Sequence, residues 1–143
     1  MGDTPGDAKE FRYRTPVNDR AKTVVNLART DRVTAAVQMV RRGGENNLHS
    51  HRHLDGVWFV LRGSARFYGE DAVVIADVGP HDGVLIPRGF RYWFESSGDE
   101  PLEILQVEAS DIALPEVSDY LADRVDFSPR NTATLPAGST GHE

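Results

Sequence analysis

Three histidines occupy alternate positions near the middle of this chain. His49, His51 and His53 fall in the segment GGENNLHSHRHLDG, between a Gly-Gly pair and a strongly apolar run. In an extended strand, residues two apart point to the same face, so these imidazoles would share one side. Imidazoles at that spacing can converge on one metal ion, for which zinc–nitrogen distances are roughly 2.0–2.1 Å. Because histidine titrates near neutral pH, the same cluster could instead transfer protons. The pattern therefore predicts a metal site or an acid–base site.

The surrounding chain consists mostly of short runs that are typical of strands. They are rich in β-branched and aromatic residues and are separated by Gly, Pro, Asp and Ser. These runs cover residues 23–27, 33–40, 57–61, 64–68, 72–75, 83–86, 92–95 and 102–107. Strands at this spacing predict an all-β sandwich or closed barrel, with the barrel over residues 21–110.

The two ends of the chain differ in composition from this central region. Residues 1–20 are polar, and we expect a flexible leader followed by an N-terminal edge strand in the stretch FRYRTPVN. Residues 111–128 are expected to form a short helical or irregular extension, with the helix over residues 114–125. Residues 129–143 are rich in Ser, Thr, Gly and Pro, which predicts a flexible tail.

Composition narrows the classes of function. The chain has 143 residues, enough for one domain, with a formal net charge of -6 and no cysteine. The negative charge argues against a nucleic-acid partner, and the lack of cysteine excludes disulfides and thiolate ligands. No apolar run is long enough for a membrane span, and residues 1–20 contain no apolar segment of a signal peptide. We therefore expect a cytoplasmic protein whose partner is a small organic molecule, with no nucleic-acid or membrane partner.

Residues 43–63 resemble the first signature motif of the cupin superfamily. That motif runs from a glycine through five residues to His-x-His, then through four residues to a glutamate and through six more to a second glycine. Gly43, His49, His51 and Gly63 are in register with it, and Gly56 stands at the glutamate position.

A later stretch, HDGVLIPRGFRYWFESSGDEP, is similar to the second cupin motif, in which Pro-x-Gly-x-x-His follows a glycine. Pro87 and Gly89 match this motif, whereas His81 replaces the leading glycine and Tyr92 replaces the histidine. The resemblance covers roughly residues 23–108. It implies an all-β, double-stranded β-helix (jelly-roll) barrel with a central pocket, followed here by a short C-terminal helix.

The resemblance also implies a cofactor and an oligomeric state. In the family, the four motif positions usually hold iron, manganese, nickel, zinc or copper, often for dioxygenase, isomerase, decarboxylase or cyclase chemistry. Only His49 and His51 carry over as metal ligands, because Gly56 has no side chain and the phenol of Tyr92 has a reference pKa of ~10. A divalent transition metal (Fe, Zn, Mn, Ni or Cu) is therefore the expected cofactor, and a homodimer is the expected assembly.

Several neighbouring residues could complete this site. His53 would be a third ligand if the strand stays regular past His51, but the family places that position near the rim. Asp55 lies next to the glutamate position and would reach inward only through a local bulge, so we expect it to cap the turn instead. His81 lies in a loop between Pro80 and Asp82, and we expect it to be exposed.

The remaining pocket candidates follow from strand parity. Gln38 and Gln106 interrupt apolar strands, and a buried amide needs partners, which favours a place in the pocket wall. Trp58 shares the inward face of Gly56, and Phe94 shares a face with Tyr92. Aromatic side chains beside two histidines would suit a flat or cyclic organic ligand.

These residues support two kinds of function. The first is a small-molecule enzyme whose reaction is assisted by a divalent metal at His49 and His51, of the oxygenase, isomerase or cyclase type. In a metal-free form of that enzyme, His49 or His51 would act as the base and Tyr92 as the acid, for an isomerisation, cyclisation or elimination. The second is a non-catalytic module that binds a small ligand in the same pocket.

Overall fold

The computed structural model describes residues 6–111, 118–120 and 132–139, and these are almost entirely strands and turns. The strands are β1 (Lys22–Arg29), β2 (Val33–Val40), β3 (His49–His51), β4 (Leu54–Arg62), β5 (Ala65–Tyr68), β6 (Val74–Val78), β7 (Gly83–Ile86), β8 (Trp93–Ser96), β9 (Leu102–Ser110), β10 (Ser118–Tyr120) and β11 (Thr132–Pro136). The described residues contain one 3₁₀ turn, η1 (Glu70–Ala72), and no helix among them is long and apolar enough to cross a membrane.

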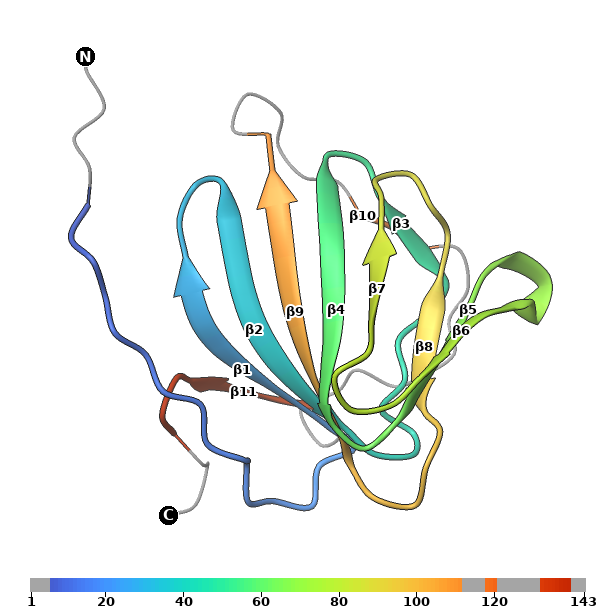
Figure 1. Ribbon diagram of the computed structural model, residues 1–143, viewed down its shortest axis with the longest axis horizontal. Coiled ribbons are helices and arrows are strands. Elements are labelled where there is room, and N and C mark those ends of the chain that lie inside the picture. Colours follow the sequence, from blue (N-terminus) through green and yellow to red (C-terminus); the bar gives the residue numbers. More distant parts are fainter. Residues whose placement is uncertain (1–5, 112–117, 121–131, 140–143) are drawn as a thin grey trace.

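The strands form one large sheet that faces two smaller ones. The large sheet has the order β11-β1-β2-β9-β4-β7, and the smaller sheets are β6-β5-β8 and β10-β3. Figure 1 shows β1, β2, β9, β4 and β7 as one curved layer, with β3, β5, β6 and β8 at the right of the view. The described pairings are antiparallel except for the one between β1 and β11. This is the predicted all-β, double-stranded β-helix architecture.

Strand parity determines which side chains enter the space between the layers. In β4, Gly56, Trp58 and Val60 are buried, while Val57 and Phe59 between them are exposed. The same alternation on the facing strands closes an apolar core of Val40, Trp58, Val60, Ala65, Phe67, Ile86, Tyr92, Phe94, Leu102 and Ile104. Burying each of the large members of this set contributes about 1.5–3 kcal/mol, so the core fixes the positions of the strands that carry the histidines.

The segment before β1 covers the outer face of the large sheet. Glu103 points to that face and is only 3% exposed. The hydroxyl groups of Tyr13 and Thr15 donate hydrogen bonds to its carboxylate, the latter at 2.8 Å, and Arg62 lies 3.6 Å from it. A buried carboxylate needs such partners. The predicted edge strand in residues 11–18 is therefore wrong: this stretch, which contains Pro16, binds Glu103 through side chains and forms no strand.

The C-terminal predictions also need correction. Most of the expected helix at residues 114–125 lies outside the described residues, and the part that is described, Ser118–Tyr120, is strand β10 paired with β3. Residues 132–136, expected in a flexible tail, form β11 along β1. The physical reason is the same at both places, since an edge strand offers unpaired N–H and C=O groups that a short extended segment can bind.

Candidate functional site

His49 and Tyr92 are joined through their backbones at the centre of the site. The N–H of each donates to the carbonyl of the other, at 3.0 Å and 2.9 Å, which forms an isolated bridge between β3 and the start of β8. The ring centroid of His49 lies 4.5 Å from that of Tyr92 and 4.9 Å from that of His51. The three predicted catalytic residues are thus brought together, with Tyr92 at the place where the second cupin motif has its histidine.

A cavity of about 280 Å³ opens beside these rings. Six residues predicted from the sequence line it: Gln38, His49, His51, Trp58, Tyr92 and Gln106. Four polar residues that the sequence did not single out also line it, namely Lys22, Asn46, Glu108 and Thr132. A wider depression of about 450 Å³ adjoins it along β1 and β2 and shares Val24, Gln106 and Glu108, so the site continues along these two strands.

Gly56 explains how this cavity differs from the motif it resembles. A Cβ at residue 56 would lie 3.9 Å from Nε1 of Trp58 and 3.9 Å from the carbonyl oxygen of Ile86. The indole N–H of Trp58 therefore lies close to where the motif's glutamate side chain would begin. Glu108 is the register partner of Gly56 on the neighbouring strand β9. The carboxylate of the site thus comes from β9 and not from β4.

His49 is held neutral with a fixed tautomer. Its ring is buried, with 5% of the residue exposed, and its Nδ1 lies 2.6 Å from the carbonyl oxygen of Asn47. Because a carbonyl can only accept, Nδ1 carries the hydrogen and Nε2 presents a lone pair. Burial, and secondly the charges of His51 and Lys22, lower the pKa of His49 to about 4, against the effect of the Asn47 hydrogen bond, which raises it.

This burial predicts an acid-sensitive fold. Because the pKa of His49 is lower in the folded state than its ordinary 6.5, the unfolded chain takes up a proton first as the pH falls from 6.5 to about 4. The free energy of unfolding should drop over that window by up to about 3 kcal/mol. Urea unfolding at a series of pH values measures this slope, and we expect His49→Gln to flatten it. An unchanged slope in that variant would place the acid sensitivity elsewhere.

Two ionisable groups on the large sheet face the histidines. Lys22, at the start of β1, is only 8% exposed, and this burial lowers the pKa of its amine to about 8. Glu108 lies on β9, with its Oε2 3.9 Å from Nε2 of His51. The cavity therefore holds an amine with a pKa of about 8, a carboxylate and two imidazoles. Such a group of side chains is typical of sites that transfer protons.

The side chains do not fit the four-position metal set that the resemblance implies. Across residues 6–111, 118–120 and 132–139, no three His, Cys, Asp or Glu side chains are grouped to hold an ion. The glutamate position holds Gly56 beside an indole N–H, and the second histidine position holds Tyr92, which is buried. The lysine charge also acts on His49. Metal binding at His49 and His51 therefore stays a prediction, and no step of the reaction proposed below depends on it.

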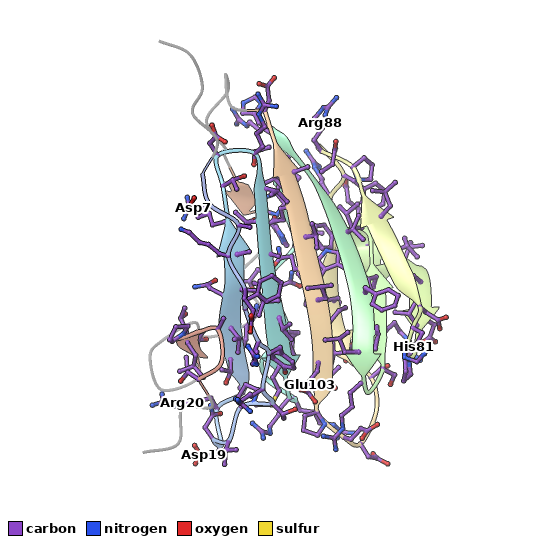
Figure 2. The ribbon with its side chains drawn as sticks, turned by 60° about the vertical axis from the view of Figure 1, so that its left-hand side comes forward. Asp7, Asp19, Arg20, His81, Arg88 and Glu103 are labelled. Atoms are coloured by element: carbon purple, nitrogen blue, oxygen red, sulfur yellow. The ribbon has the colours of Figure 1, made fainter. Side chains whose placement is uncertain are left out.

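The structure places several candidate residues away from the cavity. Asp55 accepts a hydrogen bond from the backbone N–H of Arg88 at 2.9 Å and pairs with its guanidinium at 3.2 Å, so it does not enter the cavity. The turn expected at Asp55 is wrong, because Leu54–Arg62 is strand β4, and the segment that Asp55 holds is the one after β7. His81 is exposed, with a φ of 72°, and stacks on Phe59 at 6.3 Å between centroids. Figure 2 shows His81 on the outer surface and Arg88 at the end of the molecule away from Arg20.

Two predicted pocket residues do not line the cavity. Phe94 is fully buried, with its ring 4.8 Å from that of Trp58 and 5.0 Å from that of Phe67, so it packs beneath the cavity floor. His53 lies past the end of β3, where its carbonyl oxygen accepts from the N–H of Asp111 at 3.4 Å. The strand does not continue regularly through residue 53, and the alternation that aligns His49 with His51 ends there.

Sequence patterns contained a signal for one of these missed residues, Glu108. Glu108 lies two positions after Gln106 on the same strand, so parity alone would have placed it on the same face. Lys22 shares a face with Val24, which also lines the cavity, but nothing in the sequence of that strand marks this face as the cavity side. Asn46 lies outside any strand, and its Oδ1 accepts the N–H of Phe94 at 2.7 Å, a contact that no periodicity predicts.

Comparison with known proteins establishes the fold. No protein-family model matches the sequence, and a search of curated proteins gave no significant match. Among solved structures, a protein with a double-stranded β-helix domain from Klebsiella pneumoniae matches with a TM-score of 0.61 and 21% identity, over 76% of this chain and 87% of that one. The cupin domain of Cnp3 from Schizosaccharomyces pombe matches with a TM-score of 0.59 and 19% identity, over 68% and 71%.

A third similar structure is described as an enzyme. It is a sugar phosphate isomerase from a cupin superfamily, from Silicibacter pomeroyi, which matches with a TM-score of 0.55 and 19% identity, over 64% of this chain and 58% of that one. At these identities the likeness concerns the backbone, and it agrees with the two motifs and with the strand order described above. The chain has the double-stranded β-helix fold of the cupin superfamily.

Proposed function

We propose that this protein is a small-molecule enzyme that moves a proton at a carbon next to a carbonyl or carboxyl group, without a metal, in the cavity beside His49 and His51. The observation that carries the proposal is the placement of Glu108 and Lys22 in the wall of the same cavity as the two histidines. Ionised Glu108 is a base, and protonated Lys22 is a cation that can stabilise negative charge on oxygen. Neither belongs to the motif ligand set, and together they supply both halves of an acid–base reaction.

The reaction begins with the Glu108 carboxylate as the base. It takes a proton from the carbon next to the substrate's carbonyl, and the electrons of the C–H bond form a C=C double bond as the carbonyl oxygen becomes an enolate oxygen. The Lys22 ammonium offsets the negative charge on that oxygen. In a conjugated substrate, return of the proton from Glu108 to the carbon at the far end of the double-bond system completes an isomerisation and reforms the carbonyl. In a substrate with a hydroxyl on the next carbon, Glu108 gives the proton to that hydroxyl, which leaves as water while the carbonyl reforms, and this completes an elimination.

The two histidines have different parts in this scheme. His51, with Nε2 at 3.9 Å from Glu108, is placed to pass a proton between the carboxylate and the substrate. His49 is neutral at pH 7, and its Nε2 can accept a hydrogen bond from a substrate hydroxyl. Tyr92 packs against His49 and presents its aromatic ring to the cavity. This scheme changes the acid–base alternative that the sequence suggests: Glu108 replaces histidine as the base, and Tyr92, expected as the acid, packs against His49 instead.

The fold is compatible with this class of function. One structure with the same fold is described as a sugar phosphate isomerase, an enzyme acting on a small molecule. The cavity, at about 280 Å³, is close to the lower end of the range of roughly 300–1,000 Å³ that small-molecule sites usually have. Both observations support a small organic substrate.

Hydrogen exchange tests the proposal directly. Protein dialysed against chelator, with its metal content measured by elemental mass spectrometry, should still exchange C–H hydrogen for deuterium in a panel of carbonyl and carboxylic compounds followed by NMR. We expect Glu108→Gln to slow this exchange by about 10²–10⁴-fold, the usual contribution of a general base. Glu100→Gln, at an exposed glutamate paired with Arg62, is the matched control and should leave the rate unchanged. Above about pH 8 the rate should fall, as Lys22 loses its proton.

Two results would replace this proposal with one of its alternatives. If the protein holds close to one ion per chain and loses activity when the ion is removed, the reaction is metal-assisted. If compounds bind but no C–H hydrogen exchanges at any pH, the protein is a ligand-binding module.

A further inference from the structure

Two buried polar atoms in the wall of the cavity have no hydrogen-bond partner in the described part of the chain. They are Nε1 of Trp58, which can only donate, and Oε1 of Gln38, which can only accept. Both residues line the same cavity. Buried polar groups without partners are rare in folded proteins, because leaving them unpaired costs free energy. An unpartnered donor and an unpartnered acceptor in the wall of one cavity indicate a ligand that carries an acceptor for the first and a donor for the second.

The neighbouring strands fix the direction of both atoms. Trp58 on β4 is the register partner of Gln106 on β9. The Oε1 of Gln106 in turn accepts a hydrogen bond of 2.9 Å from Nε2 of Gln38 on β2. This bond uses the amide nitrogen of Gln38 and leaves its amide oxygen buried without a partner among the described residues, in a residue that lines the cavity. The indole N–H is also buried without a partner in that part of the chain, and residue 56, the position nearest to it on β4, has no side chain that could accept its hydrogen bond.

The spacing of these strands limits the size of the ligand. β2 and β4 are separated by one strand, hence by roughly 10 Å between backbones, and the two side chains reach inward and shorten that gap. A compound with roughly three to six carbon atoms spans what remains. Lys22, also in the cavity wall, favours an anionic compound.

We infer that the ligand is a short-chain hydroxy acid, whose carboxylate accepts the hydrogen bond of Trp58 Nε1 and whose hydroxyl donates to Gln38 Oε1. This inference rests on the proposed function in that both concern the same cavity, and it names the class of substrate. It concerns atoms that the cupin motifs do not include. It also accounts for Gly56, since the missing side chain leaves an unpartnered donor where the motif would place a carboxylate.

Three simple compounds separate the two hydrogen bonds. Glycerate carries both groups, propionate carries the carboxylate alone, and glycerol carries hydroxyls alone. In ¹⁵N-labelled protein the indole N–H resonance of Trp58 is one of two such signals, since the chain has 2 tryptophans. Trp58→Phe assigns it. We expect glycerate and propionate to shift this resonance and glycerol to leave it in place, with glycerate binding about 10-fold or more tightly than propionate.

Gln38→Met provides the second half of the test. Methionine is similar in size and lacks the amide oxygen, so the advantage of glycerate over propionate should shrink to within about twofold. The affinity for propionate, which does not use Gln38, should stay the same, and this shows that the cavity is intact. Gly56→Ala, whose methyl group would lie 3.9 Å from Nε1 of Trp58, should weaken the binding of both acids.

Each contrary outcome has a definite meaning. Equal affinities for glycerate and propionate in the native protein, no shift of the indole resonance with either acid, or no binding of glycerate at all would overturn the inference. If the binding pattern holds but no compound exchanges its C–H hydrogen, the inference stands and the proposed function fails. If a compound lacking the hydroxyl–carboxylate pair is turned over and the indole resonance does not move, the proposed function stands and the inference fails.

Discussion

Gly56→Glu should give the protein a metal site that the native cavity does not assemble. The new carboxylate would point inward from β4, on the same buried face as Trp58, beside the imidazoles of His49 and His51. A Cβ at residue 56 meets only ordinary contacts at 3.9 Å, so the substitution does not strain the backbone. Two imidazoles and a carboxylate form the facial ligand set that binds divalent iron, and they also suit zinc or cobalt.

The expected gain is at least about 100-fold in affinity for Co²⁺, or about 2.7 kcal/mol, because a third ligand with a full negative charge joins two neutral ones. Titration with Co²⁺ measures this, since its visible absorption reports ligand number and geometry. Gly56→Gln is the matched control: it has the same shape without the charge and should gain far less.

A native protein that already binds Co²⁺ as tightly as the glutamate variant would contradict this expectation. It would mean that Glu108 already serves as the third ligand. The metal-assisted alternative for the enzyme would then be favoured over the acid–base reaction proposed here.

Local patterns were enough to predict the fold and about half of the cavity wall. Alternation in the strands placed Trp58, Gln38 and Gln106 inward, and the His-x-His spacing placed His49 and His51 together; all five line the cavity. These positions depend on the period of a strand, which is a property of neighbouring residues in the sequence. The motif spacing added Tyr92 at the correct place, although its residue type differs from the motif.

The rest of the site depends on which strands pair, and one strand alone does not specify this. Glu108 lies opposite Gly56 only because β9 pairs with β4 in one particular register. Lys22 reaches the cavity because β1 pairs with β2 in the same sheet, and its burial differs from the usual exposure of lysine. β10 and β11 are further cases, since both form by pairing with the edges of β3 and β1. Local composition predicted a helix and a flexible tail there, and edge pairing overrode it.

Lys22→Met should make the protein more stable and less active. The amine of Lys22 is buried, and its pKa falls from 10.5 to about 8 because burial disfavours the charged form. At pH 7 Lys22 is charged in both states, but the folded protein holds its proton less tightly than the unfolded chain does, so folding with this charge costs free energy. The shift corresponds to a cost of about 3 kcal/mol, and methionine keeps the apolar stem without the charge. After allowance for contacts that the ammonium loses, we expect a gain in the free energy of unfolding of about 2 kcal/mol.

The pH dependence of this gain identifies its cause. Between about pH 8 and 10.5 the unfolded chain holds a proton that folded Lys22 has released, so the stability of the native protein rises with pH across that window. The advantage of Lys22→Met should therefore be full below about pH 8 and vanish toward pH 10.5, as measured by urea unfolding of both proteins at each pH. Lys9→Met, at an exposed lysine, is the control and should show no such difference.

In the exchange assay, Lys22→Met should lose most of its activity, because the enolate oxygen no longer meets a cation. A variant that gained stability and kept its activity would remove Lys22 from the mechanism while leaving its burial cost intact. The lysine would then owe its place in the cavity to ligand binding alone.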